Sequence, residues 1–360
     1  MNTRPAPLAD TPTVNEAPTG PRWPEVSPIV NGPLDLMVQH QLISVNESAD
    51  AFGRMQSLAV QLACIQHTGS GLEDLRFDSP QLVVFAADHG IAVEGVSAFA
   101  QETTMQRSLA LLTGETPVNA LAQQHGFGVT LVDAGVASHI QLPPDTEAAI
   151  PLLLRKIGYG TRNMVLAPAM SMAQTRSAIE AGMDVVRHLP GNVIALSNIG
   201  VAGNACAAQL LSRLCGVPLA DACGKEQASD EVRAKRKLER LFAAASRHRK
   251  ATAPLEVLAA MGGFEIAMMC GAMVQAASER RVVLVDGFVA SAAALLARAL
   301  VPNVSDYLVF AQRSAEPGHR LLLIHLQASP LLDMELRTGQ GLGALLAWPL
   351  LQAAQRLLQR

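Results

Sequence analysis

The sequence predicts an α/β protein with a parallel sheet of about six strands and helices on both faces of the sheet. Short apolar runs that end in small or acidic residues alternate with longer helical stretches along the chain. These runs are apolar throughout, which is typical of strands buried on both faces. The composition agrees, because 49% of the 360 residues are hydrophobic and only 16% are charged, as expected for a chain with a large buried core.

The first part of the chain predicts little regular structure before the sheet begins. Residues 1–33 contain eight prolines, which indicates a flexible, extended lead-in. A helical pattern follows from about Val45 to His67. The first strand is expected at Gln81–Ala87, and the helical stretch Gln101–His125 comes after it.

The rest of the chain continues this alternation, without an internal repeat. Four further strands are expected at Val129–Ala134, Asn192–Ser197, Arg281–Asp286 and Arg320–Gln327, with a weaker one at Tyr307–Ala311. Helices are expected at Met170–His188, Asn204–Leu214, Glu231–His248, Gly263–Ser278, Phe288–Leu300 and Gly343–Leu358.

Charge and composition argue against several classes of partner. The 28 basic and 31 acidic residues give a net charge of −3, so no basic field attracts nucleic acid or an anionic membrane. Aromatic residues make up 4% of the chain, which is few for stacking on bases. Every apolar run is interrupted before ~18 residues, so no membrane span is expected.

The cysteines and histidines predict neither a disulfide framework nor a metal site. The five cysteines include no CxxC pair and no secretory signal opens the chain, which favours the cytoplasm. The histidines show no HExxH or other paired spacing, so no metal is expected.

Polar residues follow three of the predicted strands. Asp88 and His89 follow the first strand, Asp133 lies near the end of the second, and Asp286 ends the run at 281–286. Ligands of parallel sheets bind beyond the carboxyl ends of the strands. The three acids therefore either form one polar site there or separately cap helices and bind turn amides.

Glycine turns and a basic run suggest where a phosphate would bind. The turns at 158–163 (GYGTRN) and Gly200–Asn204 either cradle a phosphate on their amides or are simply tight turns. Neither matches a dinucleotide fingerprint or a P-loop. The run Arg233–Lys250 either forms a solvated helix face or supplies one lysine to a phosphate. Glu265 is expected to favour the positive end of its helix.

Taken in order, segments spanning roughly residues 35–358 resemble the nicotinate-nucleotide:dimethylbenzimidazole phosphoribosyltransferase family. The segments that carry the resemblance are FAADHG (85–90), EGVSAFAQETTMQ (94–106), VDAGV (132–136), GTRN (160–163), PLEVLAAMGGFEIAMMCGA (254–272), VDGF (285–288), SAEPGH (314–319), PLLDMELR (330–337) and GQGLGA (339–344).

The resemblance implies a fold, an assembly and a reaction. It implies a large Rossmann-like domain at 76–344, a small helical domain built from 34–75 and 345–360, and a homodimer. The implied reaction transfers phosphoribose from nicotinate mononucleotide to 5,6-dimethylbenzimidazole, giving α-ribazole 5′-phosphate and nicotinate for the lower ligand of cobalamin. The implied partners are these small molecules, with no metal or organic cofactor.

The resemblance also assigns residues to the site. Ser97 and Gln106 are expected to line the base pocket, and Gly200, Gly203 and Asn204 to hold the nucleotide phosphate. The phosphate lysine is expected at Lys235, with Lys237 as the alternative. Further substrate contacts are expected from Asp88, His89, Asp286 and Ser314. Gln340 occupies the position of the family's general-base glutamate.

Several positions depart from the family pattern. Gln340 is a neutral amide and cannot act as a carboxylate base, a role typically worth about 10²–10⁴-fold in rate. Asn198 stands where the family usually has glutamate, and Gln312 where it usually has histidine. Ala202 is an extra residue in the turn 200–204. These departures leave two alternatives open: a non-catalytic ligand-binding protein, alone or paired with a paralogue, and a transferase for another acceptor.

Overall fold

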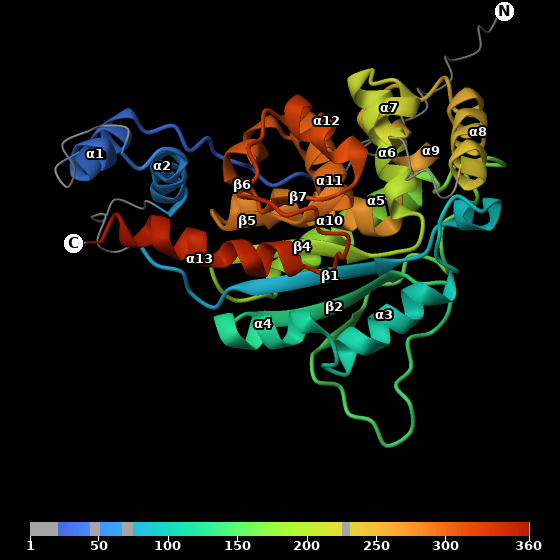
Figure 1. Ribbon diagram of the computed structural model, residues 1–360, viewed down its shortest axis with the longest axis horizontal. Coiled ribbons are helices and arrows are strands. Elements are labelled where there is room, and N and C mark those ends of the chain that lie inside the picture. The colour runs from blue at the N-terminus through green and yellow to red at the C-terminus, as the bar shows by residue number, and fades with distance from the viewer. Residues whose placement is uncertain (1–20, 44–50, 67–74, 225–230, 360) are drawn as a thin grey trace, which may run out of the picture.

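The computed structural model describes residues 21–43, 51–66, 75–224 and 231–359 and confirms the predicted α/β fold (Figure 1). Its main sheet has six parallel strands in the order β3–β2–β1–β4–β5–β6. The strands are β1 (Gln81–Ala87), β2 (Gly128–Gly135), β3 (Leu152–Leu154), β4 (Val193–Ile199), β5 (Val282–Val285) and β6 (Leu308–Phe310). Their carboxyl ends meet along one edge of the sheet, where ligands of such folds bind.

One predicted strand is wrong and one strand of the main sheet was missed, as was the small two-stranded sheet of β7 (Gln312–Arg313) and β8 (Leu332–Asp333). Residues 320–326 belong to helix α12 (Pro317–Leu326), because their apolar residues follow a helical period: Leu322, Leu323 and Leu326 are buried, whereas Ile324 is 60% exposed. The sixth strand is β3, whose three leucines pair with β2 at the edge of the sheet. Three residues are too few to produce a recognisable strand pattern.

Helices cover both faces of the sheet (Figure 1). One face carries α10 (Phe264–Ser278), which lies between the sheet and α5 (Met172–Arg187), together with α11 (Gly287–Leu300). The other face carries α3 (Glu102–Leu112), α4 (Pro117–His125) and α13 (Leu342–Arg356). The remaining helices near the carboxyl edge are α6 (Gly203–Cys215), α7 (Leu219–Cys223), α8 (Glu231–Arg247) and α9 (Pro254–Met261), and short 3₁₀ turns lie at η2 (Gly90–Glu94) and η4 (Pro302–Tyr307).

The single helix expected at 101–125 is two helices, α3 and α4. Gly114 between them has a φ of +84°, a left-handed conformation that favours glycine. Pro117 opens α4 at its first position, where its missing N–H costs no hydrogen bond. The Asn119 side chain accepts from the Thr116 amide, which completes the start of α4.

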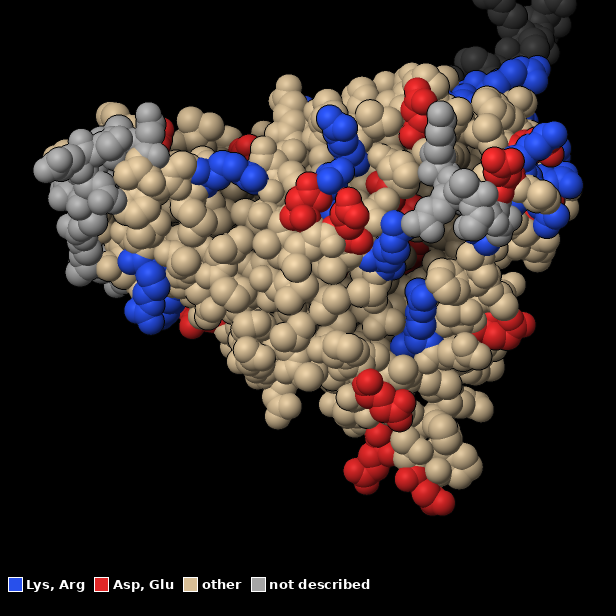
Figure 2. Space-filling model, in the orientation of Figure 1, with Lys and Arg blue, Asp and Glu red and all other residues tan. Residues whose placement is uncertain are grey.

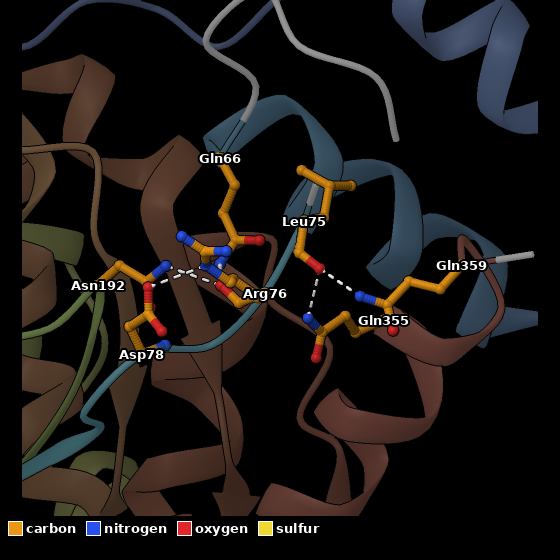
Figure 3. Close-up of polar contacts among 7 residues, drawn as sticks. All are labelled: Gln66, Leu75, Arg76, Asp78, Asn192, Gln355 and Gln359. Carbon is orange, nitrogen blue, oxygen red and sulfur yellow. Dashed lines mark hydrogen bonds and ion pairs between the residues drawn. The ribbon is translucent and has the colours of Figure 1, made fainter. Parts of the chain in front are cut away.

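Both ends of the described chain pack together beside the sheet. Helices α1 (Gly32–Ile43) and α2 (Arg54–Gln66) contact each other, and α2 also contacts α13. Figure 3 shows the polar links: the Leu75 carbonyl accepts hydrogen bonds from Gln355 and Gln359, and the Arg76 carbonyl accepts from Gln66 at 3.0 Å.

The chain ends are also joined to the large sheet region. Trp348 of α13 is buried against Phe77 and Phe127, at ring-centroid distances of 4.8 and 4.9 Å. One apolar core therefore runs from α2 through the sheet to α13.

Part of the proline-rich segment 1–33 can be described. Residues 1–20 lie outside the described ranges, and residues 21–31 form neither helix nor strand. Val26 is buried, its carbonyl accepts from Asn303 at 2.9 Å, and the Ser27 carbonyl accepts from the Tyr307 hydroxyl at 2.8 Å. This stretch is therefore fastened to η4. In the described ranges, no helix is long and apolar enough to cross a bilayer.

Candidate active site

A cleft opens at the carboxyl edge of the sheet. Its larger part, about 440 Å³, lies between α3, the turn after β4 and α8, and its smaller part, about 110 Å³, lies against the ends of β5 and β6. Residues that line both parts join them into one site: Arg107, Ile199, Gly200, Asn204, Glu316 and Arg337.

The turn after β4 forms one wall of the larger part. Gly200, Gly203 and Asn204, which were expected to hold a phosphate, all line the cleft. Helix α6 begins at Gly203, so the positive end of its dipole faces the cleft. The additional Ala202 adopts a φ of +68°, and the Val201 amide donates to the Thr104 hydroxyl at 3.1 Å, which holds the turn against α3.

Helix α8 supplies the basic side of the cleft. Figure 2 shows lysines and arginines gathered over this helix. Lys237 and Arg233 line the cleft, whereas Lys235, the preferred phosphate lysine in the sequence analysis, is exposed and is not among the lining residues. The difference follows from the 100° turn per residue of an α-helix, which places residues two apart on different faces.

Several amide side chains line the smaller part of the cleft. Asn198, Gln312 and Gln340 all line it, so the structure brings together the three positions that depart from the family pattern. Gln340 has a φ of +68° and precedes Gly341, the N-cap of α13, at +95°. A Cβ on Gly341 would lie 2.4 Å from the Leu82 side chain, so only glycine fits where the chain turns into α13.

Asp286 is a carboxylate on the same wall. It is 2% exposed, and burial raises the pKa of its carboxyl to about 6. Gln312 opposes this shift by donating from Nε2 to Oδ1 at 2.8 Å, as do the nearby amides of Gly343 and Gly341. Asp286 therefore lies at the start of α13, directly beside the Gln340 turn.

Ser314 lines the smaller part of the cleft, and a buried histidine accepts a hydrogen bond from its backbone amide. His319 Nδ1 accepts from the Ser314 amide at 2.9 Å, and its Nε2 lies 3.0 Å from the Ser291 hydroxyl. Burial, assisted by Arg313, lowers the pKa of His319 to about 3. The neutral ring therefore fixes Ser314 without contributing a charge to the site.

His89 lies beneath the cleft rather than on its wall. The ring is fully buried, with Nε2 2.9 Å from Glu265 Oε1 and Nδ1 3.3 Å from Cys206 Sγ. Burial opposes protonation, but the adjacent Cys206 and Glu265 outweigh it and raise the pKa of His89 well above its usual range. Glu265 is thus an ion-pair partner of His89 as well as an acid in the first turn of α10.

The three strand-end acids do not form one shared site. Asp88 accepts from the Ala137 amide at 2.8 Å, and burial raises its pKa. Asp133 accepts from the Val136 amide at 3.0 Å and pairs with Lys156 at 2.9 Å. Both therefore bind turns beneath the cleft, and of the three only Asp286 lines it.

The two residues expected in the base pocket differ in position. Ser97 lines the larger part of the cleft, and its hydroxyl accepts from the Phe99 amide at 3.1 Å. Gln106 is exposed on α3, and the lining residues of that helix are instead Thr103, Thr104 and Arg107.

Sequence reasoning missed three charged lining residues: Arg107, Glu316 and Arg337. Glu316 and Arg337 lie within SAEPGH and PLLDMELR, two of the segments already singled out, so position within those segments was the available signal. Among the described residues, no group of three His, Cys, Asp or Glu side chains is placed to hold a metal ion.

Comparisons with known proteins agree on one family. A family model described as a phosphoribosyltransferase matches residues 30–360. The chain is 43% identical over 336 residues to the nicotinate-nucleotide–dimethylbenzimidazole phosphoribosyltransferase of Variovorax paradoxus (strain S110), covering 93% of both chains. It is 46% identical over 313 residues to the protein of that name from Ralstonia nicotianae, covering 86% of both.

A solved structure of the same description has the same fold. The crystal structure of the protein from Thermus thermophilus superposes with a TM-score of 0.82 at 32% sequence identity. The match covers 91% of this chain and 96% of that one.

Proposed function

This chain belongs to the nicotinate-nucleotide–dimethylbenzimidazole phosphoribosyltransferase family, and we propose how its own cleft performs the reaction. It transfers phosphoribose from nicotinate mononucleotide to 5,6-dimethylbenzimidazole, giving α-ribazole 5′-phosphate and nicotinate for the cobalamin lower ligand. The observation that carries the proposal is the two-part cleft, which joins a helix N-terminus and basic side chains to a small pocket that Asn198, Gln312 and Gln340 line.

The larger part of the cleft binds the nucleotide. Its phosphate lies at the N-terminus of α6, against the turn Gly200–Asn204, and Lys237 and Arg233 approach from α8. Backbone amides, a helix dipole and two cations together suit a dianionic phosphate. Ser97 borders the space beside this nucleotide, where the acceptor base enters.

The smaller part holds the reacting atoms. A ring nitrogen of the benzimidazole forms a bond to the ribose anomeric carbon, while the bond from that carbon to nicotinate breaks and its electron pair leaves with nicotinate. The second ring nitrogen then loses its proton. Gln340 accepts a hydrogen bond from that N–H and orients the ring, and water takes the proton because an amide cannot.

A non-catalytic ligand-binding protein is the second candidate. The observation that favours it is the set of amides at Asn198, Gln312 and Gln340, which leaves no carboxylate at the position of the family's base. In that case the cleft binds its ligands without turnover.

A product assay tests the proposal. Purified protein is mixed with nicotinate mononucleotide and 5,6-dimethylbenzimidazole, and release of nicotinate and formation of α-ribazole phosphate are followed. We expect turnover by the wild type and a gain of about 10²-fold or more for Gln340→Glu, which restores a positioned base. Gln124→Glu, an exposed residue of α4, is the matched control and leaves the rate unchanged.

The other outcomes decide between the candidates. A silent wild type with an active Gln340→Glu variant supports the binding-protein candidate, because the pocket is then intact and lacks only a base. Silence from both, with the protein folded, overturns the proposed reaction and leaves a different acceptor to be sought.

We propose that the active form is a homodimer in the cytoplasm. Phe99 lines the mouth of the cleft and is 54% exposed, an apolar surface that a second copy would cover. The five cysteines form no disulfide, as is usual in a reducing compartment. Sedimentation equilibrium that gives a monomer at assay concentration would contradict the dimer.

A further inference from the structure

A second cavity, of about 590 Å³, lies apart from the cleft. It is bounded by the end of α8, the segment 162–172 and α9, and its lining shares no residue with the lining of the cleft. Hydrogen bonds join its walls: the Met170 amide donates to the Ala259 carbonyl at 2.8 Å, and the ring of the buried His248 lies 2.8 Å from the Met164 carbonyl. The cavity is therefore a fixed part of the fold.

Positive charge is concentrated around this cavity on a chain whose net charge is −3. Four cationic side chains line it: Arg162, Arg247, Arg249 and Lys250. In the part of the chain that the structure describes, none of these four side chains is paired with a carboxylate. The acid of the lining, Glu256, instead accepts from the Thr252 and Ala253 amides at 3.2 and 3.3 Å.

A helix end and an apolar floor complete the cavity. Ser171, the N-cap of the 16-residue helix α5, lines it, so the positive end of that helix dipole lies beside the four cations. Met170, Met172 and Ala259 contribute apolar surface between the charges. The site thus offers anion-binding groups and a place for an apolar group side by side.

We propose that this cavity binds a small organic phosphate. Several guanidinium groups favour a phosphate ligand over a carboxylate ligand, because a phosphate is tetrahedral and multiply charged. Each guanidinium can donate two parallel hydrogen bonds to the phosphate oxygens. The volume is that of a small-molecule site. The apolar floor takes the organic part of the ligand, so inorganic phosphate binds more weakly than its ester. This binding is separate from the substrate cleft and from the proposed reaction.

Calorimetric titration with adenosine 5′-monophosphate tests the proposal. The titration omits nicotinate mononucleotide, because it is itself an organic phosphate and would compete for the cavity. We expect adenosine monophosphate to bind more tightly than inorganic phosphate, and to bind more weakly as salt is raised. Arg247→Ala/Arg249→Ala weakens this binding by about tenfold or more, since each removes a charged hydrogen-bond donor.

Two control variants locate the bound probe. Arg320→Ala/Arg356→Ala removes two exposed arginines outside the cavity and leaves binding unchanged. Lys237→Ala, in the cleft, also leaves the binding of adenosine monophosphate unchanged. Arg249→Ala alone replaces the cavity variant Arg247→Ala/Arg249→Ala if that double variant is unstable. The proposal is overturned if the protein binds no adenosine monophosphate, if the cavity variants bind it normally, or if Lys237→Ala abolishes binding.

Discussion

At the scale of single residues, Lys235 and Lys237 form a matched pair two positions apart on α8. Lys237 lines the cleft and Lys235 is exposed away from it. We expect Lys237→Ala to raise the KM for nicotinate mononucleotide about tenfold or more, because a charged hydrogen bond to phosphate contributes about 1.5–3 kcal/mol. Lys235→Ala changes KM less than about twofold. Steady-state kinetics check this, and equal effects of the two variants would contradict it.

The same pair shows why the sequence did not identify which lysine lines the cleft. The basic run and the family resemblance predict a basic helix near the site. They do not predict which of its residues face the site, because this depends on where the helix begins and how it is rotated against its neighbours. The sequence also predicted polar residues at the strand ends correctly, without showing that Asp88 and Asp133 accept turn amides instead of facing the cleft.

A substitution at Gly263 tests how tightly the residues around His89 are packed. A Cβ on this residue would lie 2.4 Å from His89 Cε1 and 2.6 Å from Glu265 Oε2. We expect Gly263→Ala to lower the free energy of unfolding by about 1–3 kcal/mol, because the buried ion pair is displaced. Urea unfolding measures the loss. Gly32→Ala, where no atom lies within 4 Å of the new Cβ, is the control, and an equal change in both variants would argue against the explanation.

Asp286 predicts a pH dependence of stability. Its pKa is raised to about 6 in the folded protein, above the value of 3.8 taken for a free side chain. The folded state therefore binds this proton more tightly, so the carboxyl stabilises the fold at low pH and this contribution is lost as pH rises through about 6. Between pH 5 and 8 we expect the unfolding free energy of the wild type to fall by about 1–1.5 kcal/mol relative to Asp286→Asn.

Urea titrations of both proteins across that range measure the difference. Because the two proteins share every other titrating group, the subtraction isolates residue 286. A difference that stays constant, or that grows in favour of the wild type with pH, would refute the assignment.

At the scale of helices and strands, the sequence predicts buried segments better than short or ambiguous ones. Strand β1 matches its predicted bounds, because a run buried on both faces has a clear apolar pattern. Residues 320–327 read equally as a strand or a helix, and only the packing of α12 decides between the two. The break between α3 and α4 depends on Gly114 and Pro117, which are turn residues inside one apparent helical pattern.

The conformation of Gln327 predicts that glycine at this position would stabilise the C-terminal end of α12. It follows α12 with a φ of +55°, the left-handed conformation that terminates many helices and favours glycine. We expect Gln327→Gly to raise the free energy of unfolding by about 0.5–1 kcal/mol. Gln352→Gly, an exposed position inside α13, lowers it by about 1 kcal/mol. Thermal or urea unfolding checks both, and a loss of stability in both variants would contradict the prediction.

At the scale of the whole molecule, the chain ends contribute to the site through the core. The predicted boundary at 344/345 falls inside α13, which begins two residues after the cleft residue Gln340 and whose middle is packed on the sheet region. Elements far apart in sequence therefore share one core, and periodicity alone cannot reveal such long-range packing. At the sequence level, the resemblance gave the expectation of a small helical domain built from both chain ends, because it covers the whole fold and not one element.

Trp348 links this core to the turn at Gln340, which lines the cleft. It is buried against Phe77 and Phe127, and α13, to which it belongs, begins two residues after Gln340. We expect Trp348→Ala to lower the free energy of unfolding by about 3–5 kcal/mol, since it leaves a large cavity between these rings. Trp348→Phe keeps an aromatic ring and loses much less.

The same substitution also tests whether anchoring α13 positions Gln340. At a temperature where Trp348→Ala remains folded by circular dichroism, we expect slower nicotinate release with little change in KM, because the turn that orients the acceptor has lost its support while the phosphate site at α6 is untouched. Trp348→Phe retains most of the rate. If the folded alanine variant turns over at the wild-type rate, α13 stabilises the protein without holding its active site in place.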